Sequence, residues 1–125
     1  MLHQGHIASF TEAAQQADIL IVGINSDASV KRLKGPGRPV QNENARALIL
    51  ASLVITDAIV IFEEDTPLHL IRSILPDVLV KGGDYTVDQI AGAKEVIAHG
   101  GKIHIAKIVA GFSTTETINK ICGGA

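Results

Sequence analysis

Short apolar runs alternate with longer amphipathic segments along the chain, which is typical of a parallel α/β sheet with strands buried on both faces. Continuous or alternating apolar runs predict strands, whereas apolar residues three and four positions apart predict helices. The predicted strands cover residues 19–24, 58–62, 78–81 and 102–108. The predicted helices cover residues 7–17, 28–34, 44–54, 67–75, 87–99 and 113–121.

Capping and breaking residues mark the ends of several of these elements. Asp27, Thr66 and Ser113 stand at predicted helix starts, where a side-chain oxygen accepts a hydrogen bond from an orphan backbone N–H. Proline is favoured at the first helical position, which Pro67 occupies. Glycines and prolines predict a loop over residues 35–39. The whole chain therefore reads as one Rossmann-like, doubly wound α/β domain over residues 1–125.

Composition narrows the class of protein further. The chain has 125 residues, 46% of them hydrophobic and 3% aromatic, with a formal net charge of −2, which gives no electrostatic basis for binding nucleic acid or an anionic membrane. No apolar run approaches the roughly 20 residues of a membrane span. A single cysteine, Cys122, suits a reducing compartment. We expect a cytoplasmic protein without nucleic-acid or membrane partners.

Two histidines at the start of the first predicted helix are the clearest candidates for chemistry. His3 and His6 are three residues apart, so both rings share one helix face. A helix amino end favours a bound phosphate, and Gly5 adds no side chain that would keep it away. No cysteine or carboxylate stands at ligand spacing, so we expect no protein metal site here.

Three consecutive hydroxyl residues precede the last predicted helix. A helix cap needs one hydroxyl, so Ser113, Thr114 and Thr115 predict a second phosphate contact beside an ordinary cap. Gly82 and Asp84 follow a strand, and they form either a simple glycine turn or part of a ligand site at the carboxyl edge of the sheet.

The basic residues of the first half leave two interpretations open. Lys31, Lys34, Arg38 and Arg46 form either a solvated face or a phosphate site, if the loop that they flank folds over a ligand. The run 25–27, Asn-Ser-Asp, follows the first predicted strand. It is equally open to being a cap or a ligand contact.

With these motifs in order, the chain resembles the cytidylyltransferase-like nucleotidyltransferases, whose mark is His-x-Gly-His at a helix start. The resemblance runs from Leu2 to about Ile121. Within that family, the blocks at 25–35, 38–40, 62–67, 79–85 and 113–115 are similar to the branch that adenylylates heptose 1-phosphate.

The resemblance implies that AMP passes from ATP, which brings Mg²⁺, to a sugar 1-phosphate, giving ADP-sugar and pyrophosphate for lipopolysaccharide core synthesis. It implies site residues in two groups. Those expected in catalysis are His3, His6, Lys34 and Arg38, and those expected in nucleotide binding are Gly5, Arg46, Gly82, Asp84, Ser113, Thr114 and Thr115.

The chain departs from the family pattern in three places. A strand ending in Gly-x-Phe-Asp precedes the histidine motif in the family, so we expect the first central strand to be missing. Between strands 19–24 and 78–81 we expect either a gap or a distortion, or another segment that fills the place. We therefore also expect a homo-oligomer, and an inactive nucleotide-binding fragment is one alternative. Asn44 stands where the family often has an acidic residue. The second alternative, a cytidylyltransferase for glycerol phosphate, is disfavoured because 108–110 reads Ile-Val-Ala where that branch has Arg-Thr-Glu.

Overall fold

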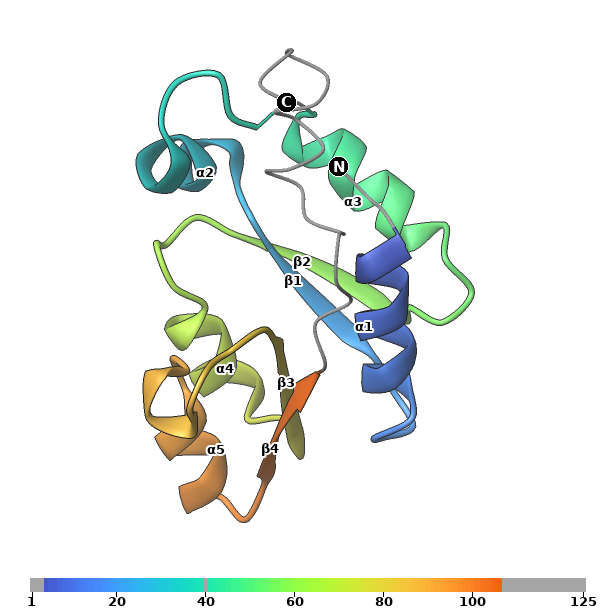
Figure 1. Cartoon of the computed structure of the whole chain (residues 1–125), viewed down its shortest axis with the longest axis vertical. Helices are drawn as coiled ribbons and strands as arrows, with labels where there is room; N and C mark the ends of the chain where they lie inside the picture. Colours follow the sequence, from blue (N-terminus) through green and yellow to red (C-terminus); the bar gives the residue numbers. More distant parts are fainter. Residues whose placement is uncertain (1–3, 40, 107–125) are drawn as a thin grey trace.

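A computed structural model describes residues 4–39 and 41–106, and its strands match the four that the sequence predicts to within about two residues at each described end. The predicted helix 113–121 lies outside the described residues. The elements are α1 (Gln4–Ala14), β1 (Ile21–Asn25), α2 (Asp27–Lys34), α3 (Glu43–Ala51), β2 (Ala58–Phe62), α4 (Leu68–Ile74), β3 (Val78–Gly82), the short 3-10 helix η1 (Val87–Gln89), α5 (Ala93–Ala98) and β4 (Lys102–Ala106) (Figure 1).

The four strands form two separate parallel pairs. β1 pairs with β2 from Ile21 opposite Ala58 onward, and β3 pairs with β4 from Val78 opposite Lys102 onward. Among the described residues, no strand lies between β1 and β3 and no ladder joins the two pairs. The α/β class with parallel strands is thus confirmed, and so is the expected gap between these two strands.

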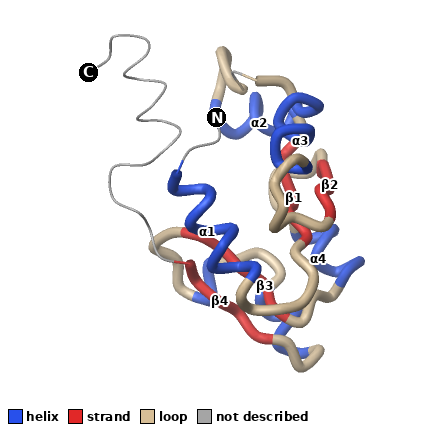
Figure 2. Tube along the Cα trace, turned by 90° about the vertical axis from the view of Figure 1, so that its right-hand side faces the viewer, coloured by secondary structure: helices blue, strands red, loops and turns tan. Residues whose placement is uncertain are grey.

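Helices cover both strand pairs. α3 packs against β2 and β1, while α5 packs against β4 and β3 and α1 packs against β4. β3 and β4 lie between α1 and α5 (Figure 1), and α1 crosses in front of them in the perpendicular view (Figure 2). No helix in the described part of the chain is long and apolar enough to cross a membrane. The buried apolar side chains are those of Ala13, Val22, Val30, Leu50, Phe62, Ile71, Ile90, Ala93, Val96 and Ala106.

Two predicted helix caps differ from the structure. Ser26, not Asp27, caps α2, because its hydroxyl accepts a hydrogen bond from the Ser29 N–H at 3.2 Å. Asp27 becomes the first helical residue, which leaves its carboxylate available for another partner. α4 begins at Leu68 after Pro67, with no side-chain cap, so the predicted capping role of Thr66 is wrong.

The predicted helix 87–99 is divided into η1 and α5. Gly92 separates them with a φ of +84°, a conformation that costs little only for glycine. A Cβ at this position would also lie 2.7 Å from Ile71 Cγ2, so the close approach of α4 excludes a side chain here. Helical periodicity continues through this break, which is why the sequence pattern predicts a single helix.

We predict that the 125-residue chain self-associates in solution. β1 and β3 each have one edge without a ladder partner among the described residues, and such edges present unpaired N–H and C=O groups that favour association. Light scattering coupled to size exclusion should give a mass above that of one 13.2 kDa chain, increasing with protein concentration. A monomer at all concentrations would contradict this prediction.

Candidate functional site

The direction of α1 relative to the strands determines where its amino end lies. A Cβ built on Gly82, at the end of β3, would lie 3.4 Å from Ser9 Oγ. Glu12, one helical turn later, contacts His104 in the middle of β4 at 3.0 Å. Because Gly82 is level with Ala106 in the ladder, α1 runs antiparallel to both strands.

The amino end of α1 therefore extends past the carboxyl edge of β3 and β4. Gly5 and His6 precede Ser9 by about one turn, or about 5 Å along the axis. The His6 ring lies near Phe10, with 6.3 Å between ring centroids. His3 lies outside the described residues. The backbone N–H groups of this helix end and its dipole suit an anion at the strand edge.

The loop after β3 follows Gly82, the residue that lies close to Ser9 of α1. Gly83 has a φ of +126°, and a Cβ there would lie 2.8 Å from the Tyr85 ring. The ring folds back over this position, which therefore requires glycine. Lys81 Nζ lies 5.3 Å from the centroid of the same ring, within range of a cation–π contact. Asp84 is exposed at the tip of this ordered turn.

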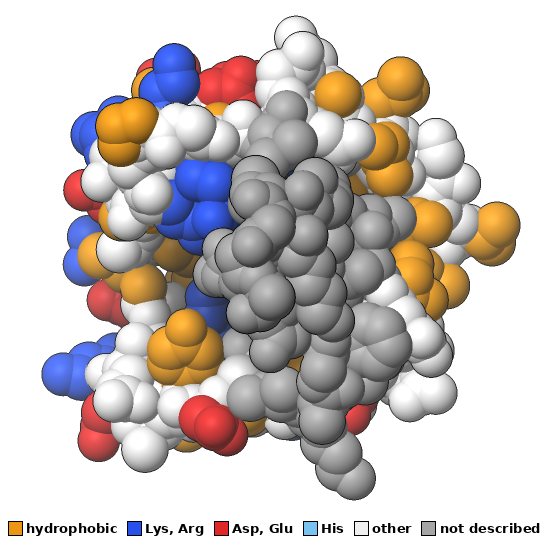
Figure 3. All heavy atoms as spheres, turned by 45° about the horizontal axis from the view of Figure 1, so that its top comes forward, with side chains coloured by type: hydrophobic (Ala, Val, Ile, Leu, Met, Phe, Trp, Pro, Cys, Tyr) orange, Lys and Arg blue, Asp and Glu red, His pale blue; other side chains and the backbone are white. Residues whose placement is uncertain are grey.

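Three cationic side chains from different segments come together on the other strand pair. Lys34 ends α2, Arg38 lies in the loop and Arg46 lies on α3. The pKa of Lys34 is lowered from its ordinary value of 10.5, mainly by burial and then by the positive charges of Arg38 and Arg46. We call these three residues the basic cluster. Figure 3 shows Lys and Arg side chains gathered on this face of the molecule.

Within the basic cluster, Arg46 is held in position by Asp27, which Glu43 supports in turn. The Arg46 guanidinium donates to Asp27 Oδ1 at 3.0 Å and to the Gln41 carbonyl at 3.2 Å, and the Arg46 side chain is only 18% exposed. Glu43 Oε1 in turn accepts a hydrogen bond from the Asp27 backbone N–H at 3.0 Å. Arg46 is thus oriented before any ligand arrives.

Polar contacts also tie the carboxyl end of β1 to the loop after β2. Asn25 donates from its amide to Ser29 Oγ at 3.0 Å, and that hydroxyl donates to the Glu64 carbonyl at 2.9 Å. Arg32 pairs with Asp65 at 2.9 Å and also bonds the Glu63 carbonyl. In the run 25–27, Ser26 is therefore a cap and Asp27 an ion-pair partner.

The structure brings together some predicted site residues and leaves others undescribed. Lys34, Arg38 and Arg46 form one group, whereas Gly5, His6, Gly82 and Asp84 belong to the β3–β4 side. His3, Ser113, Thr114 and Thr115 lie outside the described residues. Figure 1 shows α2, α3 and the amino end of α1 at the same end of the molecule.

Sequence reasoning missed the acidic partners of the basic cluster. Asp27 is 19 positions from Arg46, and Glu43 is 16 from Asp27, so neither pairing follows from local periodicity. The only signal in the sequence was the excess of positive charge around the glycine–proline loop, because such charges are usually compensated by nearby carboxylates.

Within residues 4–39 and 41–106, no group of three or more His, Cys, Asp or Glu side chains could hold a metal ion. Mg²⁺ requires an octahedron of oxygen ligands, which the imidazole and the cations of this site do not supply. The described residues therefore do not fit a resident Mg²⁺.

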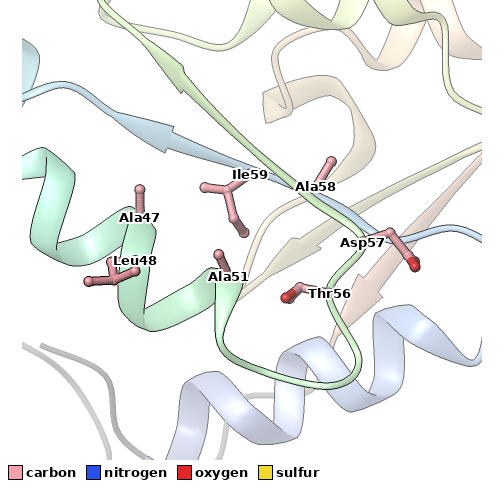
Figure 4. Close-up of a pocket in the computed structure, with 7 residues that line it drawn as sticks. All are labelled: Ala47, Leu48, Ala51, Thr56, Asp57, Ala58 and Ile59. Carbon is pink, nitrogen blue, oxygen red and sulfur yellow. The ribbon is translucent and has the colours of Figure 1, made fainter.

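A separate cavity lies between α3 and β2, away from these residues. It has a volume of about 360 Å³ and an alanine-rich lining (Figure 4). Its one ionisable residue, Asp57, accepts a hydrogen bond from the Leu20 N–H at 2.8 Å. None of the predicted site residues lines this cavity.

Comparison with known proteins places this geometry in context. Residues 1–120 match the family model described as Cytidylyltransferase-like. The chain is 54% identical over 125 residues to "Bifunctional protein HldE" of Rhodospirillum rubrum, and 56% identical over 125 residues to that of Nitrobacter winogradskyi. All of this chain is covered in both cases, but the chain spans about a quarter of the length of these relatives.

A solved structure is similar as well. It is that of the lipopolysaccharide core biosynthesis protein from Thermoplasma volcanium GSS1, which matches this chain with a TM-score of 0.66 at 25% identity. The similarity covers 87% of this chain and 88% of the other.

We predict that the affinity of the basic cluster for a polyphosphate depends on pH through Lys34. Only the charged amine attracts an anion, and its pKa lies below 10.5, so affinity should fall as pH rises through the lowered value. Calorimetric titration with ATP at about pH 8 and about pH 10 measures this. Lys34→Met should weaken binding at the lower pH by about 1.5–3 kcal/mol, and Lys34→Arg should retain affinity at the higher pH.

Lys31→Met is the matched control, since Lys31 is exposed on the same helix and is not among the charges that shift the pKa of Lys34. If Lys31→Met and Lys34→Met lose equal ATP affinity, both lysines belong to a generally solvated basic face and not to a specific phosphate site.

Proposed function

Because this chain belongs to the Cytidylyltransferase-like family, we propose that it transfers AMP from ATP to a sugar 1-phosphate, with heptose 1-phosphate as the substrate. The observation that carries the proposal is the antiparallel seating of α1, with the amino end of this helix beyond the carboxyl edge of β3 and β4. Ligands of open α/β sheets bind at this edge.

The proposed reaction is an in-line displacement at phosphorus. An oxygen of the sugar 1-phosphate attacks the α-phosphorus of ATP, and the bond from that phosphorus to the bridging oxygen breaks. The products are ADP-sugar and pyrophosphate, so all atoms of both substrates are retained. Such a reaction needs positioning and charge neutralisation more than covalent help from the protein.

Each group of residues has a role in this scheme. His3 and His6 hydrogen-bond the triphosphate beside the N–H groups of α1, where Gly5 admits it closely. Lys34, Arg38 and Arg46 stabilise phosphate charge on the substrate or the leaving pyrophosphate. Gly82 and Asp84 lie beside the nucleoside, and the hydroxyls of Ser113, Thr114 and Thr115 hold the far end of ATP. Mg²⁺ brought by ATP would supply further charge neutralisation, and none of the residues named here would hold it.

The similar solved structure supports a role in lipopolysaccharide synthesis, because it is that of a lipopolysaccharide core biosynthesis protein. The choice of heptose 1-phosphate rests on the resemblance of the sequence blocks at 25–35 and 79–85. We propose that the chain acts in the cytoplasm, where ATP is available. Its partners are the two substrates and a second copy of itself.

The proposed function is tested by pyrophosphate release, and the same assay tests the two histidines. Release should require both ATP and heptose 1-phosphate, and CTP should be a poorer donor. His3→Ala or His6→Ala should raise the activation free energy by about 2–4 kcal/mol and so lower kcat. The reason is that the contacts of both histidines strengthen as charge moves onto the leaving pyrophosphate.

Each negative outcome of this assay has its own meaning. A preference for CTP with glycerol phosphate would favour the cytidylyltransferase alternative. Binding of ATP without any turnover would favour an inactive nucleotide-binding fragment. A near-normal kcat in both histidine variants would remove the imidazoles from the mechanism. His69→Ala is a control, since His69 lies on α4, outside the site.

The consecutive hydroxyls give a further prediction. If Ser113 and Thr114 bind the outer phosphates, the double alanine variant should weaken ATP binding and leave AMP binding nearly unchanged, because AMP lacks those phosphates. A simple helix cap would instead lose about 0.5–2 kcal/mol of folding stability with nucleotide affinity unaltered. Paired titrations with ATP and AMP, together with a melting curve, distinguish the two roles.

A further inference from the structure

One long-range contact joins the end of α1 to the centre of β4. Glu12 Oε2 and His104 Nε2 are 3.0 Å apart, although the residues are 92 positions apart in the chain. Both side chains are partly buried, with 27% of Glu12 and 32% of His104 exposed. A neutral imidazole with its proton on Nε2 donates to the carboxylate, and so does the charged ring. The contact therefore does not depend on which of these two forms is present.

Apart from this contact, α1 buries little apolar surface that could fix its position. Of its residues, only Ala13 is buried, and among the strands α1 packs mainly against β4. Apolar contacts between smooth surfaces are non-directional. A hydrogen bond with a charged partner, by contrast, has a defined distance and angle. The Glu12–His104 contact thus supplies the direction that apolar packing lacks.

A displacement at Glu12 is transmitted to the amino end of the helix. His6 precedes Glu12 by six residues, or about 9 Å along the axis, and the hydrogen-bonded backbone between them moves as one rod. Val80 and Gly82 lie on the same strand face as His104 by their alternation and register. Sliding or rotation of α1 on this face would move Gly5 and His6 relative to the carboxyl edge.

We propose that Glu12 and His104 are positioning residues that hold α1 in the register at which its amino end meets the phosphates. This inference rests on the proposed function, because it assigns that helix end to the triphosphate. Neither residue touches the substrates. A misplacement of about 1 Å far from the chemistry can cost about 100-fold in rate, so a single remote hydrogen bond is enough to matter.

The test compares variants that break the contact with one that keeps it. Glu12→Ala and His104→Leu remove the acceptor and the donor, while Glu12→Gln retains an oxygen that accepts from Nε2–H. Alanine is also the best helix former, so Glu12→Ala does not weaken α1 itself. Glu95→Ala is the matched control, because Glu95 pairs with Arg72 at 3.4 Å between α4 and α5, away from α1.

Two readouts are needed: backbone hydrogen exchange of residues 7–14, and kcat and KM from pyrophosphate release well below the melting temperature. In Glu12→Ala and His104→Leu we expect exchange in α1 to accelerate at least about fivefold. We expect kcat to fall about 10-fold, with KM for the sugar 1-phosphate within about threefold. The double variant should be no worse than either single variant, and Glu12→Gln should stay within about threefold of wild type.

Failure of this inference differs from failure of the proposed function. Unchanged exchange and kcat in the two breaking variants would overturn the inference, and so would faster exchange with unchanged kcat, since the contact would then be merely structural. If the wild-type chain releases no pyrophosphate, the proposed function fails. ATP affinity then replaces kcat, and unaltered affinity in the breaking variants would overturn the positioning role.

Discussion

The packing of α1 against β3 and β4 is the contact on which the candidate site depends. Parallel strands place their carboxyl ends at one edge, and a helix that runs antiparallel to them presents its amino end there. The closeness of Ser9 to Gly82, followed by Glu12 at His104, establishes that direction. The positive end of the α1 dipole then faces the same edge as the loop after β3. Without this seating, the histidine motif would be an ordinary helix start.

Charge in the rest of the site is only partly compensated. Asp27 pairs with Arg46, while desolvation and then the positive charges of Arg38 and Arg46 lower the pKa of Lys34. This arrangement carries a repulsive cost in the absence of an anion, because like charges are held near one another. A phosphate would relieve that cost, so the repulsion itself favours an anionic ligand over a neutral one.

Local pattern was sufficient for the strands, because burial on both faces leaves continuous apolar runs that are readable without tertiary information. It failed where a contact from elsewhere decides the outcome. Gly92 breaks the predicted helix because Ile71 of α4 approaches it. Likewise, the Glu12–His104 and Asp27–Arg46 pairs join segments that no periodicity relates. The histidine motif could be read from spacing, whereas the substrate rests on resemblance to relatives.

The two strand pairs share no ladder among the described residues, and α4 contacts both halves. Leu70 packs on Gly23 of β1, where a Cβ would lie 3.2 Å from Leu70 Cδ2, and Ile71 packs at Gly92 before α5. Arg72 adds an ion pair to Glu95. Leu70 of α4 therefore contacts the half of the molecule that carries the basic cluster, whereas Ile71 and Arg72 contact the half that carries α1. Because apolar packing is non-directional, the distance between the two phosphate-facing groups is set less strictly than the geometry within each. A ligand that bridges both groups would itself supply the missing constraint.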